Sequence, residues 1–406
     1  MLSGRKILLA VTGGIAAYKA CELVRLLTKH GASVQVLMTE AATHFVNPLT
    51  FEALSGRKVA LDMFAGEEPG QSHLDIVRDA NLMVIAPSTA NSIAKLACGI
   101  ADDLMGTAAL ALGAPLLICP AMNPRMFWHP AVQENLMTLR RRGVHVMDPA
   151  EGPMAHPLEE PGWGRLPEGA EILDRICRLL PPQGPLSGAI ITITAGPTQE
   201  ALDPVRYLSN YSSGRMGFAL AEEARRRGAD VRLISGPSAL PPPPGVDVFH
   251  IASTAQLQRA VNKHFHSSKA LIMAAAPADF QPQKTQTQKI KKPAGDQGLS
   301  IHLQKTPDIL QRLGRKKGSR VLVGFALETE RGVENARLKL KQKNLDLIVL
   351  NHPRPAAGAG MGENAIQATL ISAKGPEEVL PVMSKGELAA LILDRLTGLL
   401  VGRKSA

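Results

Sequence analysis

The sequence predicts an α/β protein made of two doubly wound, Rossmann-like domains with mainly parallel sheets. Short runs of Leu, Ile and Val alternate with helical patterns through both halves of the 406 residues. The alternation restarts after a Pro- and Gly-rich segment at 181–188, and KHGASVQVLMT in the first half is echoed by RRGADVRLISG in the second. We therefore expect a first domain over 1–180, a linker over 181–188 and a second domain over 189–406.

The first domain opens with a buried strand, Lys6–Val11, followed by a helix over residues 14 to 30. Small and aliphatic residues recur at helical spacing on one face of that helix. Gly31 can end it in the left-handed conformation. The further strands expected in this domain are Val34–Met38, Leu82–Ala86, Leu116–Cys119 and Val144–Met147.

The second domain repeats this order. A strand at Ala189–Thr194 precedes a helix at Gly217–Arg227, which Gly228 can end. Strands separated by helices form parallel sheets that are covered on both faces. The further strands expected here are Val231–Ile234, Ala270–Ala274, Val321–Gly324 and Asp346–Leu350.

Composition excludes several classes of protein. With 45% hydrophobic and 20% charged residues, global disorder is not expected. The net charge of +10 favours an anionic partner, which nucleic acid, acidic lipid or a phosphorylated small molecule would each satisfy. Aromatic residues make up 3% of the chain and leave few platforms for stacking bases, and RNA-binding motifs are missing. We therefore expect no nucleic-acid partner, the alternative being a basic, nucleotide-regulated RNA binder.

The apolar runs and the cysteines bear on location. No apolar run has the length of a membrane span, and the first residues precede a strand rather than resembling a signal peptide. Four widely spaced cysteines without a CxxC pair indicate neither a structural zinc site nor a disulfide framework. We expect a cytoplasmic protein with no membrane partner.

Ligands in open parallel sheets bind beyond the carboxyl ends of the strands. A Gly pair, Gly13 and Gly14, follows the first strand and opens a helix, where free N–H groups favour a phosphate. The same pair also suits a plain tight turn. VTGGIAA lacks the GxGxxG spacing, so a nicotinamide dinucleotide is disfavoured. The other strand ends of this domain carry the hydroxyls and amides that a nucleotide site needs, in Thr39-Glu40, Pro87–Asn91 and Pro120–Asn123.

Two further residues of this domain have plain alternatives. His73 lies in SHLDIVRDA, where a lone histidine is more often a surface or cap residue than a catalyst. Asn123 equally suits a turn. Both roles remain open on the residues alone.

The second domain has the denser signal, TAGPTQEALDPVRYLSNYSSGRMG over 194–217. A buried strand runs into small and hydroxyl residues with two arginines, and then into a helix, so backbone amides, serines and arginines can cradle phosphates. The alternative is a structured loop with solvated arginines. Farther on, Asp279 follows a strand, and Lys289, Lys339 and Lys343 come from separate segments that can converge on a triphosphate.

Together these motifs carry a resemblance. GGIAAYK, MTEAA, SHLDI, APSTAN and PAMN stand in the first half, and the long 194–217 signature, AAAPADF, KIKK, PDI, GFALET and KNLDLI stand in the second. The chain resembles the family of bifunctional phosphopantothenoylcysteine decarboxylase/phosphopantothenate–cysteine ligases, flavoproteins of coenzyme A biosynthesis. The match runs almost end to end, and the ligase signature is its most specific part.

For the second domain the resemblance implies a ligase that uses CTP and a divalent metal, Mg²⁺, whose ligands the sequence does not identify. The carboxylate of 4′-phosphopantothenate would be activated as an acyl-cytidylate, and L-cysteine would attack it and release CMP. Asn210 would act on the acyl-cytidylate, and Arg206 would hold a phosphate. The residues implied to bind CTP are Ala274, Ala275, Ala276, Asp279, Lys289, Pro307, Asp308, Ile309, Phe325, Lys339 and Lys343.

For the first domain the resemblance implies an FMN-dependent decarboxylase that makes 4′-phosphopantetheine. Flavin oxidation of the thiol to a thioaldehyde supplies the electron sink that an ordinary α-carboxylate lacks. His73 would be the catalytic base, and Asn123 would hold the substrate carboxylate. The residues implied to bind FMN are Gly13, Gly14, Ile15, Thr39, Ser88 and Thr89.

The chain departs from the family pattern in one loop. Where the family has a cysteine within ACGxxGxGR, this chain reads AHPLEEPGWGRL, with His156 at the cysteine position. Three readings are open: His156 is the proton donor, since imidazole titrates near neutrality; another group protonates; or this half decarboxylates only oxidatively or is inactive. We expect the segment to be a mobile lid of the flavin site.

The resemblance also implies a homo-oligomer. Flavin domains would form trimers with the site shared between subunits, and ligase domains would form dimers. A dodecamer would satisfy both.

Overall fold

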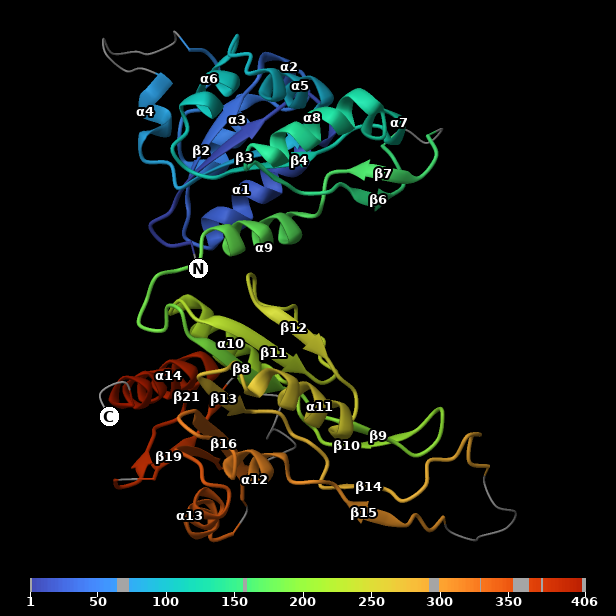
Figure 1. Cartoon of the computed structure of the whole chain (residues 1–406), viewed down its shortest axis with the longest axis vertical. Coiled ribbons are helices and arrows are strands. Elements are labelled where there is room, and N and C mark those ends of the chain that lie inside the picture. The colour runs from blue at the N-terminus through green and yellow to red at the C-terminus, as the bar shows by residue number, and fades with distance from the viewer. Residues whose placement is uncertain are drawn as a thin grey trace. The chain divides into compact units, whose positions relative to one another are not determined.

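The computed structural model describes residues 2–63, 73–155, 159–291, 299–328, 330–352, 365–373 and 375–403, without the side chains of residues 73 and 74. Contacts divide the chain into two compact units, Met1–Pro181 and Pro182–Ala406 (Figure 1). Within the described residues, no helix has both the length and the apolar character needed to cross a membrane.

The first unit has a five-stranded sheet in the order β2-β1-β3-β4-β5, and each neighbouring pair is parallel. The order places the first strand inside the sheet, as doubly wound folds require. The predicted first strand has the observed bounds, and the others agree to within a few residues. The strands are β1 (Lys6–Val11), β2 (Ser33–Met38), β3 (Leu82–Ser88), β4 (Leu116–Pro120) and β5 (His145–Val146).

Helices cover both faces of this sheet. Successive side chains of β1 point to opposite faces, so Leu9 and Val11 pack in one buried cluster and Leu8 and Ala10 in another. One face is covered by α1 (Lys19–Lys29), α3 (Pro48–Ser55) and α9 (Gly169–Leu179), and the other by α5 (Ala90–Cys98), α6 (Leu104–Ala111) and α8 (Pro130–Arg141).

The second unit has an eight-stranded sheet in the order β12-β11-β8-β13-β16-β17-β19-β20. The first six strands of that order run parallel, whereas β19 and β20 pair antiparallel. The prediction of mainly parallel sheets is confirmed. The strands are β8 (Ile190–Ala195), β11 (Asp230–Ser235), β12 (Asp247–His250), β13 (Ala270–Met273), β16 (Val321–Leu327), β17 (Leu347–Asn351), β19 (Ala368–Ser372) and β20 (Glu378–Val379).

Two layers of helices again enclose the sheet. At the start of α10, Gly217 lies so close to β8 that a Cβ atom would be 2.4 Å from the Cβ of Ala195. Glycine is therefore required where this helix leaves the signature loop. One face is covered by α10 (Arg215–Arg226) and α14 (Lys385–Gly402), and the other by α11 (Thr254–Phe265), α12 (Ile309–Gly314) and α13 (Gly332–Gln342).

Small elements that the sequence analysis did not anticipate border the sheets. In the second unit, β9 (Gln199–Ala201) pairs with β10 (Tyr207–Ser209), and β14 (Phe280–Pro282) pairs with β15 (Leu303–Lys305). Figure 1 shows both pairs extending away from the large sheet. The remaining short elements are the 3₁₀ turn Ile15–Tyr18, α2 (Glu40–Thr43), α4 (His73–Arg78), α7 (Pro124–Phe127), β6 (Ala150–Gly152), β7 (Gly162–Arg165), β18 (Ala365–Ile366) and β21 (Met383–Ser384).

Candidate functional site

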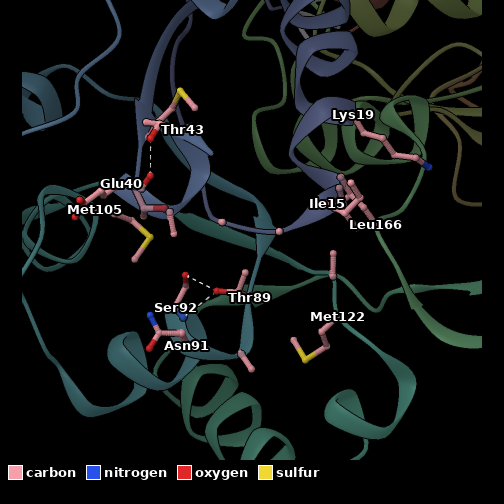
Figure 2. A pocket seen from close by; sticks show the side chains of 18 of the residues that line it. Ile15, Lys19, Glu40, Thr43, Thr89, Asn91, Ser92, Met105, Met122 and Leu166 are labelled. Carbon is pink, nitrogen blue, oxygen red and sulfur yellow. Dashed lines mark hydrogen bonds between the residues drawn. The ribbon is translucent and has the colours of Figure 1, made fainter. Parts of the chain in front are cut away.

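The first unit contains a cavity of about 1600 Å³ at the carboxyl ends of its strands. Four successive strand ends contribute to it, because Gly13 follows β1, Thr39 follows β2, Thr89 follows β3 and Asn123 follows β4. Figure 2 shows the labelled lining residues around it, with Ile15 and Leu166 adjacent on one side and Thr89, Asn91 and Ser92 on another. The volume exceeds that of a typical pocket for one small ligand.

The two glycines after β1 are there for different reasons. A Cβ atom at Gly13 would lie 2.4 Å from the Cβ of Ala41 and 2.8 Å from its backbone carbon, so packing alone requires glycine. A Cβ atom at Gly14 would meet nothing nearer than Thr89 Cγ2 at 3.6 Å, and its φ of −160° suits any residue. Packing against Ala41 therefore accounts for Gly13 but not for Gly14, where the missing side chain leaves the backbone open to a ligand.

Hydroxyl groups join the ends of β1 and β3. The Thr12 hydroxyl donates to the Pro87 carbonyl at 2.8 Å and accepts from the Thr89 N–H at 3.1 Å. The Thr89 hydroxyl in turn accepts from the Ser92 N–H at 3.3 Å and so caps α5. These bonds fix the cavity wall on which Thr89 stands.

Two hydroxyls lack a partner within the described residues, Thr39 Oγ1 and Ser88 Oγ, although both atoms are buried. An unsatisfied buried donor costs about 1–3 kcal/mol, so each is a candidate for a bond to a ligand. Thr39 lines the cavity, and its orphaned oxygen fits a polar ligand there. Ser88, which the resemblance implies to bind FMN, is fully buried and is not part of the cavity lining.

Asn123 lines the cavity and also caps a short helix. Its Oδ1 accepts from the Arg125 N–H at 2.9 Å at the start of α7. The turn role and the site role are thus compatible, because the cap engages the oxygen while the amide nitrogen is a second, separate polar group.

The side chains of both histidines predicted to be catalytic lie outside the described residues. His73 begins α4, but its side chain lies outside the described residues, and so does the whole of His156. Residues on both sides of the latter, Ala155 and Glu159, line the cavity.

Ion pairs at the cavity wall were missed by the sequence analysis. Lys95 Nζ lies 2.7 Å from Asp102 Oδ1 and 3.1 Å from Asp103 Oδ2, and the bond with Asp102 raises the pKa of Lys95. Lys19 Nζ lies 2.9 Å from Glu168 Oε1, which lowers the pKa of Glu168. Asp103 also caps α6, since its Oδ1 accepts from the Gly106 N–H at 2.7 Å.

In the second unit, the loops after β8 and β13 are bonded to each other. The Ala276 N–H donates to the Gly196 carbonyl at 2.9 Å. Asn210 Nδ2 donates to the carbonyls of Ala276 at 3.2 Å and Pro277 at 3.1 Å. The structure thus brings Asn210 against the segment that holds Ala274, Ala275 and Ala276, all partly buried.

A second group of predicted residues lies around the start of α12 and the end of α13. The Asp279 carbonyl accepts from the Thr306 N–H at 2.9 Å, which holds the segment with Pro307 and Ile309 beside β13's loop. Asp308 Oδ1 accepts from the Gln311 N–H at 2.9 Å and caps α12, while Asp308 Oδ2 pairs with Lys343 Nζ at 3.0 Å.

Lys339 is also paired, its Nζ lying 2.6 Å from Glu328 Oε1, just beyond β16 and the partly buried Phe325. Lys339 in the last turn of α13 and Lys343 at its C-cap are therefore each paired with a carboxylate of a predicted motif. Lys289 precedes Ile290, whose carbonyl accepts from Arg206 Nη2 at 3.1 Å. No hydrogen bond or ion pair among the described residues joins Lys289 to Lys339 or Lys343, so their convergence stays a prediction.

Both units of the chain match known protein families. Residues 186–399 match the family described as DNA/pantothenate metabolism flavoprotein C-terminal domain, and residues 1–181 match the family described as flavoprotein. The coenzyme A biosynthesis bifunctional protein CoaBC of Bacillus subtilis (strain 168) is 45% identical over 403 residues, covering 98% of each chain. Its Mycobacterium bovis counterpart is 41% identical over 419 residues, covering 99% of this chain and 98% of its own.

The chain belongs to the family of coenzyme A biosynthesis bifunctional proteins. Among solved structures, the C-terminal domain of CoaBC has 36% identity and a TM-score of 0.46, covering 54% of this chain and 99% of its own. The full-length relatives and the two family matches confirm the family expected from the sequence motifs. The cavity lies within the flavoprotein match, and the Asn210 loop lies within the pantothenate-metabolism match.

Proposed function

We propose that this coenzyme A biosynthesis protein joins 4′-phosphopantothenate to L-cysteine with CTP and then decarboxylates the product to 4′-phosphopantetheine. The observation that carries the proposal is full-length similarity to bifunctional relatives, with 98% of both chains covered. The polar strand-end groups in each unit support it, because two reactions need two sites. The substrates are small molecules, and no nucleic acid or membrane takes part.

The proposal predicts a yellow purified protein with a flavin absorption spectrum. Supplied with 4′-phosphopantothenate, CTP and Mg²⁺, it should release CMP only when L-cysteine is also present. The matched control omits 4′-phosphopantothenate, which should reduce CMP release to background. A colourless protein that retains RNA in a salt-dependent manner and turns over no CTP would instead support the RNA-binding alternative.

In the ligase unit, a carboxylate oxygen of 4′-phosphopantothenate attacks the α-phosphorus of CTP, and pyrophosphate leaves. The cysteine amine then attacks the acyl carbon of the acyl-cytidylate, and CMP leaves as its bond to that carbon breaks. Asn210 holds the acyl-cytidylate beside Ala276, and Arg206 holds a phosphate. Mg²⁺ would neutralise charge on the departing pyrophosphate.

The CTP-binding residues of the ligase are proposed from two groups of contacts. Two ion pairs, Lys343 with Asp308 and Lys339 with Glu328, hold the two cations in place. Phe325 lies in β16, the strand that Glu328 follows, and is proposed to contact the same nucleotide. An incoming triphosphate competes with those carboxylates for the lysines, which act as flexible point charges. The remaining contacts are assigned to Ala274, Ala275, Ala276, Asp279, Lys289, Pro307 and Ile309.

In the flavin unit, the cavity residues fit FMN. The orphaned Thr39 Oγ1 and the open backbone at Gly14 are two features that a polar, phosphorylated ligand satisfies. Gly13, Ile15 and Thr89, which line the cavity, complete the proposed contacts. When bound, FMN would supply the two-electron oxidation of the substrate thiol that makes loss of CO₂ feasible.

The chain's own groups position the substrate and move its protons. Asn123 holds the substrate carboxylate, and His73 accepts a proton from the substrate as the base. His156 stands where the family motif has a proton-donating cysteine. We assign it that role because the described residues that flank it, Ala155 and Glu159, line the cavity. An imidazole group can take up or release a proton near neutral pH.

Substituting His156→Ala should leave ligase activity unchanged and alter only the decarboxylase product. Because the proton donor is lost, phosphopantothenoylcysteine should yield a product two hydrogens lighter than phosphopantetheine. Mass analysis of the product, alongside CMP release, measures both at once. If the variant still makes phosphopantetheine, another group protonates the intermediate. Loss of CMP release would contradict the proposal that the two reactions use separate sites.

The proposed assembly has trimeric flavin domains, dimeric ligase domains and a dodecamer that combines them. Each unit has exposed aromatic side chains that subunit contacts could cover. Trp128 and Trp163 are 59% and 44% exposed in the first unit, and Tyr211 and Tyr207 are 96% and 54% exposed in the second.

A further inference from the structure

Asp203 is a buried carboxylate of the second unit that is not among the residues proposed to bind substrate. It lies in the turn between β9 and β10, and its side chain is 0% exposed. A buried charge is costly unless hydrogen bonds and opposite charges compensate it. The partners of Asp203 therefore indicate what the residue holds in place.

Both carboxylate oxygens of Asp203 are engaged. Oδ1 accepts from the N–H groups of Val205 at 2.7 Å and Arg206 at 2.8 Å, and Oδ2 accepts from the Ile290 N–H at 3.0 Å. Arg206 Nη1 lies 3.8 Å from Oδ2. Burial alone would raise the pKa of Asp203. The hydrogen bonds from Ile290, Val205 and Arg206 outweigh it and lower the pKa below its usual value, so the carboxylate is charged at neutral pH.

The Ile290 peptide is held from both sides. Its N–H donates to Asp203, and its carbonyl accepts from Arg206 Nη2 at 3.1 Å. The same segment is bonded to the start of the turn, since the Gln286 N–H donates to the Leu202 carbonyl at 2.9 Å. Lys289, the residue before Ile290, is exposed, so its backbone is anchored while its side chain is available.

We propose that Asp203 is a positioning residue of the ligase, which fixes the segment carrying Lys289 against the loop carrying Arg206. This rests on the proposed function, in which those two side chains bind the phosphates of CTP and 4′-phosphopantothenate. One buried carboxylate thereby sets the separation of two cations that lie in distant parts of the sequence. Asp203 itself touches neither substrate.

The test is Asp203→Asn in the full chain. The amide keeps an acceptor for Val205 and Arg206 but presents N–H groups to the Ile290 N–H and the guanidinium, so it repels the anchored peptide. The KM for CTP should rise roughly tenfold, as for an unsatisfied buried donor, while kcat changes less. The flavin spectrum should not change. The matched control is Asp230→Asn, an exposed aspartate in the same unit, which should leave KM unchanged.

A double-mutant cycle decides whether Asp203 acts through Lys289. Lys289→Gln should itself raise the KM for CTP, and Asp203→Asn should then add less than twofold on that background. Fully multiplicative effects, or an unchanged KM in Asp203→Asn, would overturn the inference. An unchanged KM in Lys289→Gln would instead remove Lys289 from the proposed CTP site.

Hydrogen exchange in the unsubstituted protein gives a second test that does not depend on a variant's folding. The Ile290 amide should be strongly protected, because its acceptor is a fully buried carboxylate. Exchange of peptides covering residues 285–291 at the rate of exposed loops would overturn the proposal. Protection that is lost in Asp203→Asn but kept in Asp230→Asn would support it.

Discussion

Asn210→Ala should lower the rate of CMP release by roughly 100- to 1000-fold, the range seen when one preorganised polar contact to a reacting group is removed. In the structure, Asn210 Nδ2 is fixed by the carbonyls of Ala276 and Pro277, so the side chain has one orientation beside the proposed CTP segment. The alanine variant loses both the contact to the acyl-cytidylate and that anchoring. Steady-state CMP release with L-cysteine measures the effect, and the loss should appear mainly as a lower kcat.

The control for Asn210 is its neighbour Ser209. The Ser209 hydroxyl donates to the Thr198 carbonyl at 2.8 Å, so Ser209→Ala also removes one side-chain tether of the same loop. That variant should keep ligase activity within roughly fivefold, since a single neutral hydrogen bond contributes about 1 kcal/mol. Equal losses in the two variants would mean that loop order, and not contact with the intermediate, explains the Asn210 result.

Gly13→Ala should remove flavin binding and destabilise the first unit. Its new methyl group would lie 2.4 Å from the Cβ of Ala41 and 2.8 Å from that residue's backbone carbon, so the chain must shift. Overpacking of this kind costs about 1–3 kcal/mol. The melting temperature followed by circular dichroism should fall by several degrees, and the yellow colour should be lost on purification.

Gly14→Ala provides the contrast, because its methyl group meets nothing closer than 3.6 Å. This variant should leave the melting temperature unchanged and weaken only flavin binding, because the methyl group obstructs the approach of the flavin. Gly113→Ala, where the space is open, should change neither property. Gly13→Ala as stable as Gly14→Ala would contradict the packing explanation. Ligase activity should be unaffected in all three variants.

The fold was predictable from sequence where elements are long and apolar. β1 and β3 are continuous buried runs, and the helix before Gly31 has clear helical spacing, so local pattern and final structure agree. The hairpin strands β9 and β14 have three residues each and include polar side chains, which is too short for a two-residue period to show. Their pairing is set by tertiary contacts.

The site was predictable to the extent that it follows from sheet geometry. The rule that ligands bind beyond strand ends placed Gly13, Thr39, Thr89 and Asn123 together, and all four line one cavity. The rule cannot tell which way a side chain points at the last residue of a strand, and Ser88 points into the protein.

The charged pairs were not predictable. Lys19 and Glu168 are 149 residues apart in sequence, and Asp203 and Ile290 are 87 apart, so only the folded chain reveals them. Asp203 does precede a proline in a turn, which indicates local bonds to Val205 and Arg206. Nothing local indicates its third partner.

The central claim is that one chain performs both reactions in sequence. It is tested most directly by supplying the full chain with 4′-phosphopantothenate, L-cysteine, CTP and Mg²⁺, and determining the mass of the final product. The account predicts stoichiometric CMP and a product with the mass of 4′-phosphopantetheine. Phosphopantothenoylcysteine accumulating without loss of CO₂, or no CMP at all, would contradict it.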